Sequence, residues 1–208
     1  MPQQGYLLIA DIAGYTAFLT QGELEHAQDI LNTLFHALLD NTRHPLIVSK
    51  LEGDAIFSYA PGKSFLNPQI LLETIENLYY VFADTQEKMH RNTTCTCTAC
   101  SLIPNLDLKF AAHYGEFLEV NIGGSEELSG ASVILVHRLL KNTITEKTKV
   151  TAYAYFTKAC IEAAQLTEMS AGMLPHTENY EYIGDVDGYV HDLKPVWKAQ
   201  REARRVCI

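Results

Sequence analysis

Hydrophobic positions recur along this chain with two different periods, which predict strands and helices. Residues 6–12 form an apolar run with β-branched members, interrupted only by Asp11, which is typical of a buried strand. Residues 23–41 and 68–91 place apolar side chains three and four positions apart, which predicts two long amphipathic helices. Residues 45–60 fit two strands that meet at Gly53-Asp54, a strong hairpin turn. The hydrophobic positions expected to face the core from the two helices are Ile30, Leu31, Leu34, Leu38, Leu39, Ile70, Leu71, Ile75, Leu78, Tyr79 and Phe82.

The second half of the chain continues the mixture of strands and helices. We expect a strand over 106–122, a helix over 131–142, a short strand and a helix within 148–168, and a closing hairpin over 179–193. A short helix after residue 14 completes the order β-α-α-β-β-α-β-α-β-α-β-β. Hairpins mixed with helical crossovers predict an α+β sandwich, in which helices cover a largely antiparallel sheet.

Composition narrows the class of protein. The 208 residues suit a single domain, 1–208, and a hydrophobic fraction of 47% is enough to form a core. The net charge of −9 argues against a nucleic-acid partner, which would need a basic surface. No apolar stretch reaches the roughly 20 residues of a membrane span, and the start lacks the pattern of a signal peptide. We therefore expect a cytoplasmic protein without membrane contact. Residues 196–208 form its C-terminal tail, in which the segment KAQREARR is expected to be a solvated helix end.

Two carboxylates stand at the predicted ends of strands. Asp11 closes the first strand, and Asp54 lies at the hairpin tip. If these strands are neighbours, both acids emerge at one end of the sheet, where they need a shared cation or a raised pKa. Oxygen ligands at a partly open site suit Mg²⁺ or Mn²⁺. The alternative is structural: Asp11 would cap the following helix, and Asp54 would be an ordinary turn residue.

Five segments in order extend this interpretation. They are IADIAGYTAF, SKLEGDAIFSYAPG, LKFAAHYGEF, ELSGASVILVHRLLKN and YIGDVDGYVHDL. From residue 6 to about 195 the chain resembles the catalytic domain of class III adenylyl and guanylyl cyclases, within an uncharacterised bacterial subgroup that carries a CxCxxC insertion. The resemblance implies a ferredoxin-like α+β fold and a head-to-tail homodimer with its sites at the interface. It also implies two metal ions that activate a ribose hydroxyl and hold a nucleoside triphosphate.

The resemblance assigns roles to the opening segments. Asp11 and Asp54 match the metal-binding aspartates, and the carbonyl of Ile12 matches a further ligand. The backbone that follows would present N–H groups to the triphosphate at a helix start. The residues concerned are Ala13, Gly14, Tyr15 and Thr16. A plain strand-to-helix turn is the alternative.

Three further side chains match functional positions. Lys50 and Glu127 occupy the places of the lysine and the acid that recognise adenine, which favours ATP. Arg138 matches the arginine that stabilises the pentavalent phosphorus. Lys50 and Glu127 could instead form a surface salt bridge worth under about 1 kcal/mol, and Arg138 could be solvated helix surface.

Two positions depart from the family pattern. Ile134 stands where an asparagine normally orients the ribose, and isoleucine cannot form that hydrogen bond. Asp187 replaces a lysine that holds the triphosphate, with Lys194 as a neighbour that could compensate. We therefore expect a homologue that converts ATP slowly to cyclic AMP and pyrophosphate. The alternative is an inactive signalling module that binds nucleotide or metal and contains a structural zinc loop.

The cysteine-rich loop at 92–104 forms a second candidate metal site. Three of the five cysteines lie within six residues, which favours metal binding or free thiols over disulfides. Structural zinc takes four Cys or His ligands. The predicted set is His90, Cys95, Cys97 and Cys100, with Cys160 or Cys207 as other sources of a fourth ligand. His26 and His36 are expected to be helix surface residues. The alternative is a reduced, metal-free loop; with metal, its role would be structural or regulatory.

Overall fold

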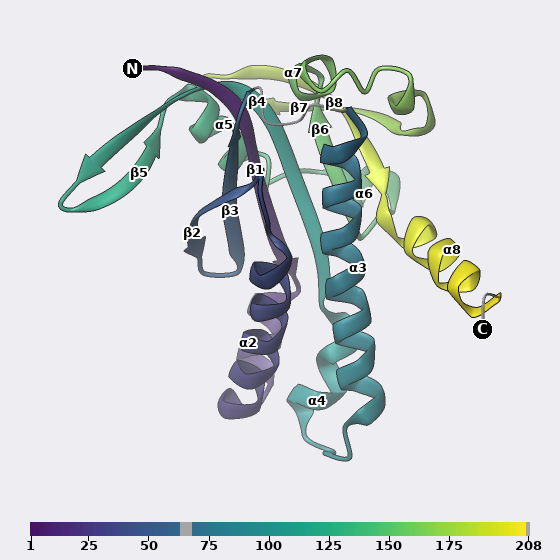
Figure 1. Ribbon diagram of the computed structural model, residues 1–208. Coiled ribbons are helices and arrows are strands. Elements are labelled where there is room, and N and C mark those ends of the chain that lie inside the picture. Colours follow the sequence, from purple (N-terminus) through teal and green to yellow (C-terminus); the bar gives the residue numbers. More distant parts are fainter. Residues whose placement is uncertain (63–67, 207–208) are drawn as a thin grey trace.

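The computed structural model describes residues 1–62 and 68–206 and confirms the predicted α+β class (Figure 1). The sheet has the strand order β2-β3-β1-β4-β6-β8-β7, and β5 pairs with the far part of β4. Each pairing is antiparallel except that between β4 and β6. The strands are β1 (Gln3–Ala13), β2 (Ile47–Glu52), β3 (Ala55–Pro61), β4 (Asp107–Ile122), β5 (Ser125–Ser129), β6 (Tyr153–Thr157), β7 (Leu174–Tyr180) and β8 (Gly184–Asp192).

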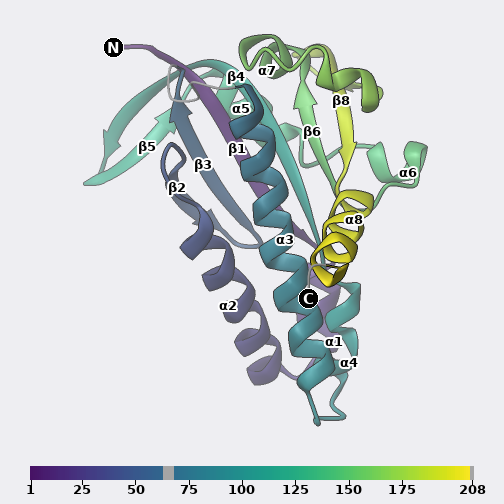
Figure 2. The same ribbon diagram turned by 45° about the vertical axis from the view of Figure 1, so that its right-hand side comes forward.

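Helices cover the sheet on both faces. The two long helices α2 and α3 run side by side over one face, and α5 lies behind the other (Figures 1 and 2). The helices are α1 (Tyr15–Gln21), α2 (Leu24–Asn41), α3 (Pro68–Asn92), α4 (Thr98–Leu102), α5 (Ala131–Arg138), α6 (Ile144–Thr148), α7 (Lys158–Ala163) and α8 (Leu193–Val206), with 3₁₀ turns η1 (Ile103–Asn105) and η2 (Met169–Gly172). In the described ranges, no helix is long and apolar enough to cross a membrane.

The central strand β1 supplies both hydrophobic cores. Its side chains alternate, so Leu8 and Ile12 face the core beneath α2 and α3, while Leu7 and Ile9 face the core beneath α5. This two-sided burial explains why the strand lacks an alternating polar pattern. The same alternation places Asp11 on the α5 side, at the end of the strand.

Some predicted elements differ from those observed. The acidic strand β5 was missed because most of its side chains are exposed, so it lacks an apolar face; its hairpin with β4 projects from the body (Figure 1). The loop predicted over 92–104 contains α4 and η1, which are too short to show a helical period. Ile70, expected in the core, is 36% exposed.

The C-terminal tail at 196–208 is helical as far as it is described, and this helix docks on α3 instead of being wholly solvated. Helix α8 begins at Leu193, and its Trp197 donates a hydrogen bond of 2.8 Å from Nε1 to Asp84 on α3. Arg201 forms an ion pair with Glu87, also on α3. The hydrogen bond of Trp197 and the ion pair of Arg201 fix the helix to its neighbour. Residues 207–208 lie outside the described part of the chain.

Candidate functional site

Strand pairing brings the two predicted carboxylates to one end of the sheet. Asp11 is opposite Ala55 in the β1–β3 ladder, directly after the hairpin turn that contains Asp54. The amide of Ile12 donates a hydrogen bond of 3.0 Å to the carbonyl of Asp54. Both acids are partly buried. The two residues are therefore held as neighbours by backbone bonds, whatever their side chains bind.

The pKa of Asp11 is shifted by its burial and by the charged groups beside it. Burial raises the pKa of Asp11 to about 6; the nearby charge of Asp54 adds to the rise, and Lys109 opposes it. Lys109 is the cross-strand partner of Asp11 on β4, and its ammonium lies 5.7 Å from the ring centre of Tyr153. Two carboxylates that repel each other at a partly open strand end have the donor set and the excess negative charge that suit Mg²⁺ or Mn²⁺.

The chain turns sharply after Asp11 and opens the backbone to solvent. Gly14 has φ of 86° and is the N-cap of α1, with no side-chain capping bond. Asp11 therefore does not cap this helix, which removes the structural alternative for that residue. A Cβ at Gly14 would lie 2.8 Å from the carbonyl oxygen of Asn105, so only glycine fits this turn. Gly14 and Thr16 are exposed, whereas Ala13 and Tyr15 are partly buried.

The predicted adenine-reading pair is assembled within one chain. Lys50 on β2 bonds Glu127 on β5, with Nζ and Oε2 2.6 Å apart, and its ammonium is also 3.3 Å from Glu52. The hydrogen bond to Glu127 raises the pKa of Lys50. Glu52 in turn bonds His137 of α5 at 2.7 Å. The two predicted residues thus form part of a polar chain that links the hairpin, the β5 arm and α5.

Helix α5 carries the predicted catalytic arginine on its exposed side. Ile134 and Arg138 are one turn apart on this side, and Ile134 is 59% exposed. Together with Val133, His137 and Lys141 they line a shallow surface groove. Among the described residues, Arg138 has no ion-pair partner. No ion pair in the described part of the chain joins Arg138 to Asp11 or Asp54, and the arginine is exposed.

The unusual aspartate of β8 has a partner of its own. The hydroxyl of Thr177 on β7 donates a hydrogen bond of 2.7 Å to Asp187. Lys158 lines the same surface hollow as Asp187. Lys194, which the sequence offered as a compensating cation, instead pairs with Asp107 at 2.7 Å. Asp187 is therefore a cross-strand pairing residue, and Lys194 is engaged elsewhere.

The cysteine segment forms a compact group with a different histidine from the one predicted. The donor atoms of His26, Cys95, Cys97 and Cys100 all lie within 4.8 Å of one another, as a metal site requires. His90, the predicted ligand, is not in this group; it lies exposed in the last turn of α3. His26 takes the place expected for His90 because α2 and α3 are antiparallel. The first turn of α2, which carries His26, therefore meets the loop that follows α3 (Figure 1).

Within the described ranges, neither of the other proposed ligands is found in this group. Cys160 is 1% exposed in the core and outside the group, while Cys207 lies outside the described residues. Sequence reasoning missed His26, because it expected only a surface role, and it missed the Glu52–His137 bond. The sequence did contain one indication of His26 as a ligand. It lies in the first turn of a helix that packs beside the cysteine loop.

The fold is that of class III adenylyl and guanylyl cyclase domains. The structure of a bacterial light-regulated adenylyl cyclase superposes with a TM-score of 0.66 at 13% identity, covering 97% of this chain and 98% of that chain. The guanylyl cyclase Cya2 gives 0.67 at 16% identity, covering 91% and 92%. The guanylate cyclase domain of RhGC from Catenaria anguillulae, in complex with GTP, gives 0.58 at 11%, covering 91% and 97%.

Sequence comparison assigns the chain to a family. Residues 31–149 match the family model described as "Protein of unknown function (DUF2652)", and the chain belongs to this family. The uncharacterized protein Rv2561/Rv2562 of Mycobacterium tuberculosis (strain ATCC 25618 / H37Rv) is 35% identical over 149 residues. The match covers 70% of this chain and 66% of that relative's length.

Proposed function

We propose that this protein binds a purine nucleoside triphosphate with a divalent cation, and that it converts ATP slowly to cyclic AMP and pyrophosphate. The observation that carries the proposal is the pair of partly buried carboxylates, Asp11 and Asp54, held side by side next to an exposed glycine turn. Bound Mg²⁺ or Mn²⁺ would supply charge neutralisation and activation of the ribose hydroxyl. The carbonyl of Ile12 completes the proposed ligand set.

The backbone after the carboxylates would position the phosphates. Ala13 and Gly14 bend the chain, and the amides of Tyr15 and Thr16 begin α1 without intrahelical acceptors. Such free N–H groups favour an anion. Since Gly14 and Thr16 are exposed, a triphosphate can reach this turn from solvent.

The Lys50–Glu127 pair would choose the base. A lysine ammonium donates to a ring nitrogen of adenine, and a carboxylate accepts from its exocyclic amine. The two groups are already 2.6 Å apart and partly exposed, so the pair must open slightly to admit the base edge. The neighbouring Glu52 keeps Lys50 oriented in the opened state. This arrangement favours ATP over GTP.

The outward position of Arg138 supports a homodimer. An arginine that stabilises a pentavalent phosphorus must contact the transferring group. Since the described chain does not bring Arg138 to its own Asp11 and Asp54, a second copy would supply the arginine across the interface. Two equivalent sites would then form in a head-to-tail pair.

Two substitutions in the site limit the expected rate. Ile134 sits one turn before Arg138 and offers no hydrogen bond to a ribose. Asp187 lies on β8, away from the end of the sheet that carries Asp11 and Asp54 of the same chain, so in the proposed homodimer the second copy would bring it to the phosphates. There it would repel them, at about 4 kcal/mol for a contact of about 4 Å in an effective dielectric of about 20. Its bond from Thr177 holds the carboxylate in place without removing its charge. We therefore expect turnover well below that of an efficient enzyme.

The test is incubation of the purified protein with ATP and Mn²⁺, with cyclic AMP and pyrophosphate both measured. Asp54→Asn removes one proposed ligand and should lower product formation by about 100-fold or more. Asp29→Asn, an exposed change on α2, is the matched control and should leave the rate unchanged. Equal rates in wild type and Asp54→Asn would refute the metal assignment.

A second function, binding without turnover, is favoured by the exposed Ile134 and by Asp187. Calorimetric titration with a non-hydrolysable ATP analogue and Mn²⁺ separates the two. Binding that disappears in Asp54→Asn, without product from ATP, would establish a nucleotide-binding module. Absence of both binding and product would overturn the proposed function.

A further inference from the structure

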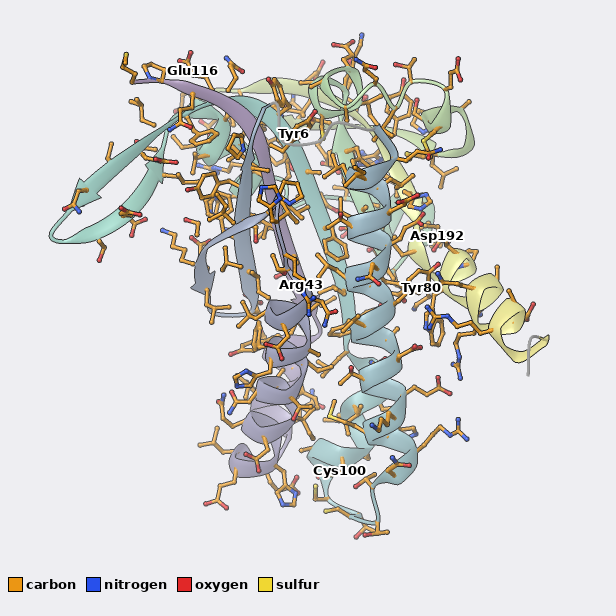
Figure 3. The ribbon with its side chains drawn as sticks, viewed as in Figure 1. Tyr6, Arg43, Tyr80, Cys100, Glu116 and Asp192 are labelled. Atoms are coloured by element: carbon orange, nitrogen blue, oxygen red, sulfur yellow. The ribbon has the colours of Figure 1, made fainter. Side chains whose placement is uncertain are left out.

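We propose that His26, Cys95, Cys97 and Cys100 bind one zinc ion, and that this zinc site braces α1, the helix that follows Asp11. The site is independent of the nucleotide proposal, because none of its ligands belongs to the carboxylate end of the sheet. It joins the first turn of α2 to the segment between α3 and β4. Cys100 is seen at the lower ends of these helices (Figure 3).

The donor atoms already have spacings close to those of a tetrahedral zinc site. His26 Nδ1 lies 3.2 Å from Cys97 Sγ and 3.7 Å from Cys95 Sγ. Zinc bonds of about 2.3 Å to sulfur and about 2.0 Å to nitrogen place tetrahedral ligands about 3.6 Å apart for a nitrogen–sulfur pair. Three thiols and one imidazole are a complete set for structural zinc. Mg²⁺ and Mn²⁺, which prefer oxygen, are poor matches.

Local hydrogen bonds hold the ligand segment in this shape. Cys97 is the N-cap of α4, and its sulfur accepts a hydrogen bond from the amide of Cys100 at 3.4 Å. The carboxylate of Glu23 accepts the amides of Thr98 and Ala99 at 3.1 and 2.9 Å. Glu23 is itself the N-cap residue of α2, so it ties α4 to the helix that carries His26. Second-shell bonds of this kind orient metal ligands.

The same segment is in close contact with both ends of α1. A Cβ at Gly22, which ends α1, would lie 3.0 and 3.2 Å from the Cβ and Cα of Ala99. At the other end, a Cβ at Gly14 would lie 2.8 Å from the carbonyl oxygen of Asn105. Residues 99–105 therefore run against the length of α1, and Figure 2 shows α1 and α4 together. Helix α4 meets the end of α1 at Gly22, and η1, which directly follows α4, meets its start at Gly14. A shift of residues 98–105 would therefore be transmitted to both ends of α1.

Metal analysis of the tag-free protein tests the site. Wild type and His90→Gln should each hold about one zinc per chain. His26→Gln and Cys95→Ser should each hold about tenfold less zinc than wild type. Both ligand changes are at exposed side chains and should not prevent folding, which circular dichroism can check. His90→Gln is the matched control. Equal zinc in His26→Gln and His90→Gln would overturn the ligand assignment.

Cobalt provides a readout that does not depend on zinc supply. Stripped wild-type protein given Co²⁺ should show the intense visible absorption of a tetrahedral thiolate site, and His26→Gln should need about tenfold more Co²⁺ to reach it. Absence of zinc in the purified protein together with absence of this absorption would dismiss the site. Metal bound with the ligand-field spectrum of an octahedral site would also contradict it.

Hydrogen exchange tests the brace. Removal of zinc should speed amide exchange about tenfold over residues 15–21 and 98–105, and leave residues 174–192 unchanged as an internal reference. Unchanged exchange over 15–21 in protein that has lost its zinc would refute the brace. Exchange that speeds as much over 174–192 as over 15–21 would also refute the brace, because the metal would then have no particular effect on α1.

Discussion

The two candidate metal sites are built in opposite ways. Asp11 and Asp54 are fixed by the ladder between two strands, so the fold brings like charges together and their mutual repulsion disfavours the empty site. The His/Cys group, His26, Cys95, Cys97 and Cys100, lies on helices and a loop that few sheet bonds restrain. A cation at the first site relieves an electrostatic cost that the fold imposes. At the second, the cation itself would complete the local structure.

The largest expected effect is at the His/Cys group. Cys97→Ser should lower the free energy of unfolding of the zinc-loaded protein by about 3 kcal/mol, a fall in Tm of about 6–12 °C. Serine is also a good N-cap, so the start of α4 keeps its capping bond and the loss reports the metal. His90→Gln should stay within about 0.5 kcal/mol of wild type. The measurement is thermal unfolding with and without a zinc chelator.

The chelator sharpens this comparison. It should bring the Tm of wild type down to that of Cys97→Ser and leave the variant unchanged, since the variant has no zinc to lose. A variant that remains less stable than chelated wild type would show that Cys97 acts through packing. The two candidate sites would then differ less than proposed.

The two sites also differ in how far the sequence predicts them. The ends of the strands that carry the carboxylate pair could be predicted, because the two-residue turn places Asp54 at the tip of the β2–β3 hairpin and the apolar run places Asp11 at the end of β1. The pairing of β1 with β3 is a long-range contact, which the sequence offered only as a condition. The His/Cys group depends on how two helices pack side by side. Helical periodicity shows which face of a helix is buried but not which turns of the two helices meet. His26 is 71 residues from Cys97, and nothing local connects them.

Strand β5 is a second feature that the sequence pattern did not predict. Its residues extend the sheet beyond the core, so exposure on both sides removes the alternating pattern by which strands are recognised. Glu127 lies on it, and the Lys50–Glu127 bond is set by where this arm folds back. The family resemblance suggested the two residues as a pair, but their separation of 2.6 Å follows only from the position of the arm.

A change in stability of intermediate size is expected at the carboxylate site in the absence of metal. In metal-free protein, Asp11→Asn should raise the free energy of unfolding near pH 7 by about 1–3 kcal/mol, opposite in sign to the cysteine variant. The reason is that burial and Asp54 raise the pKa of Asp11 from 3.8 to about 6. A raised carboxyl pKa contributes stability below about pH 4, which is lost as the pH rises through 6.

A buried histidine titrates across the same range with the opposite sign. Burial lowers the pKa of His113 from 6.5 to about 4, so its stabilising contribution is present above pH 6.5 and is lost as the pH falls toward 4. In wild type the two slopes, each worth up to about 3 kcal/mol, should largely cancel. In His113→Gln the free energy of unfolding should fall as the pH rises, because only Asp11 then contributes. In Asp11→Asn it should rise with pH, because only His113 then contributes. Chemical denaturation from pH 4 to 7 measures both, and parallel curves for the two variants would contradict the assignment.

The smallest expected effect on stability is at the proposed adenine-reading pair. Lys50→Gln breaks a partly exposed ion pair and should change the free energy of unfolding by less than about 1 kcal/mol. The preference for a non-hydrolysable ATP analogue over its GTP counterpart should nevertheless fall about tenfold. The loss of one charged hydrogen bond to the base costs about 1.5 kcal/mol or more, and water cannot restore it in the bound state. Competition calorimetry with Mn²⁺ measures the ratio.

Two further variants decide whether the lysine reads the base or merely adds positive charge. Lys147→Gln removes the same charge from an exposed position on α6 and should leave the ATP-to-GTP ratio unchanged. Glu127→Gln keeps Lys50 near its place, because Glu52 still lies 3.3 Å from the ammonium, but it loses the carboxylate proposed for the exocyclic amine. The ratio should therefore fall in Glu127→Gln as well. If both analogues weaken equally in Lys50→Gln, the lysine attracts phosphate in general, and the choice of base must lie elsewhere in the site.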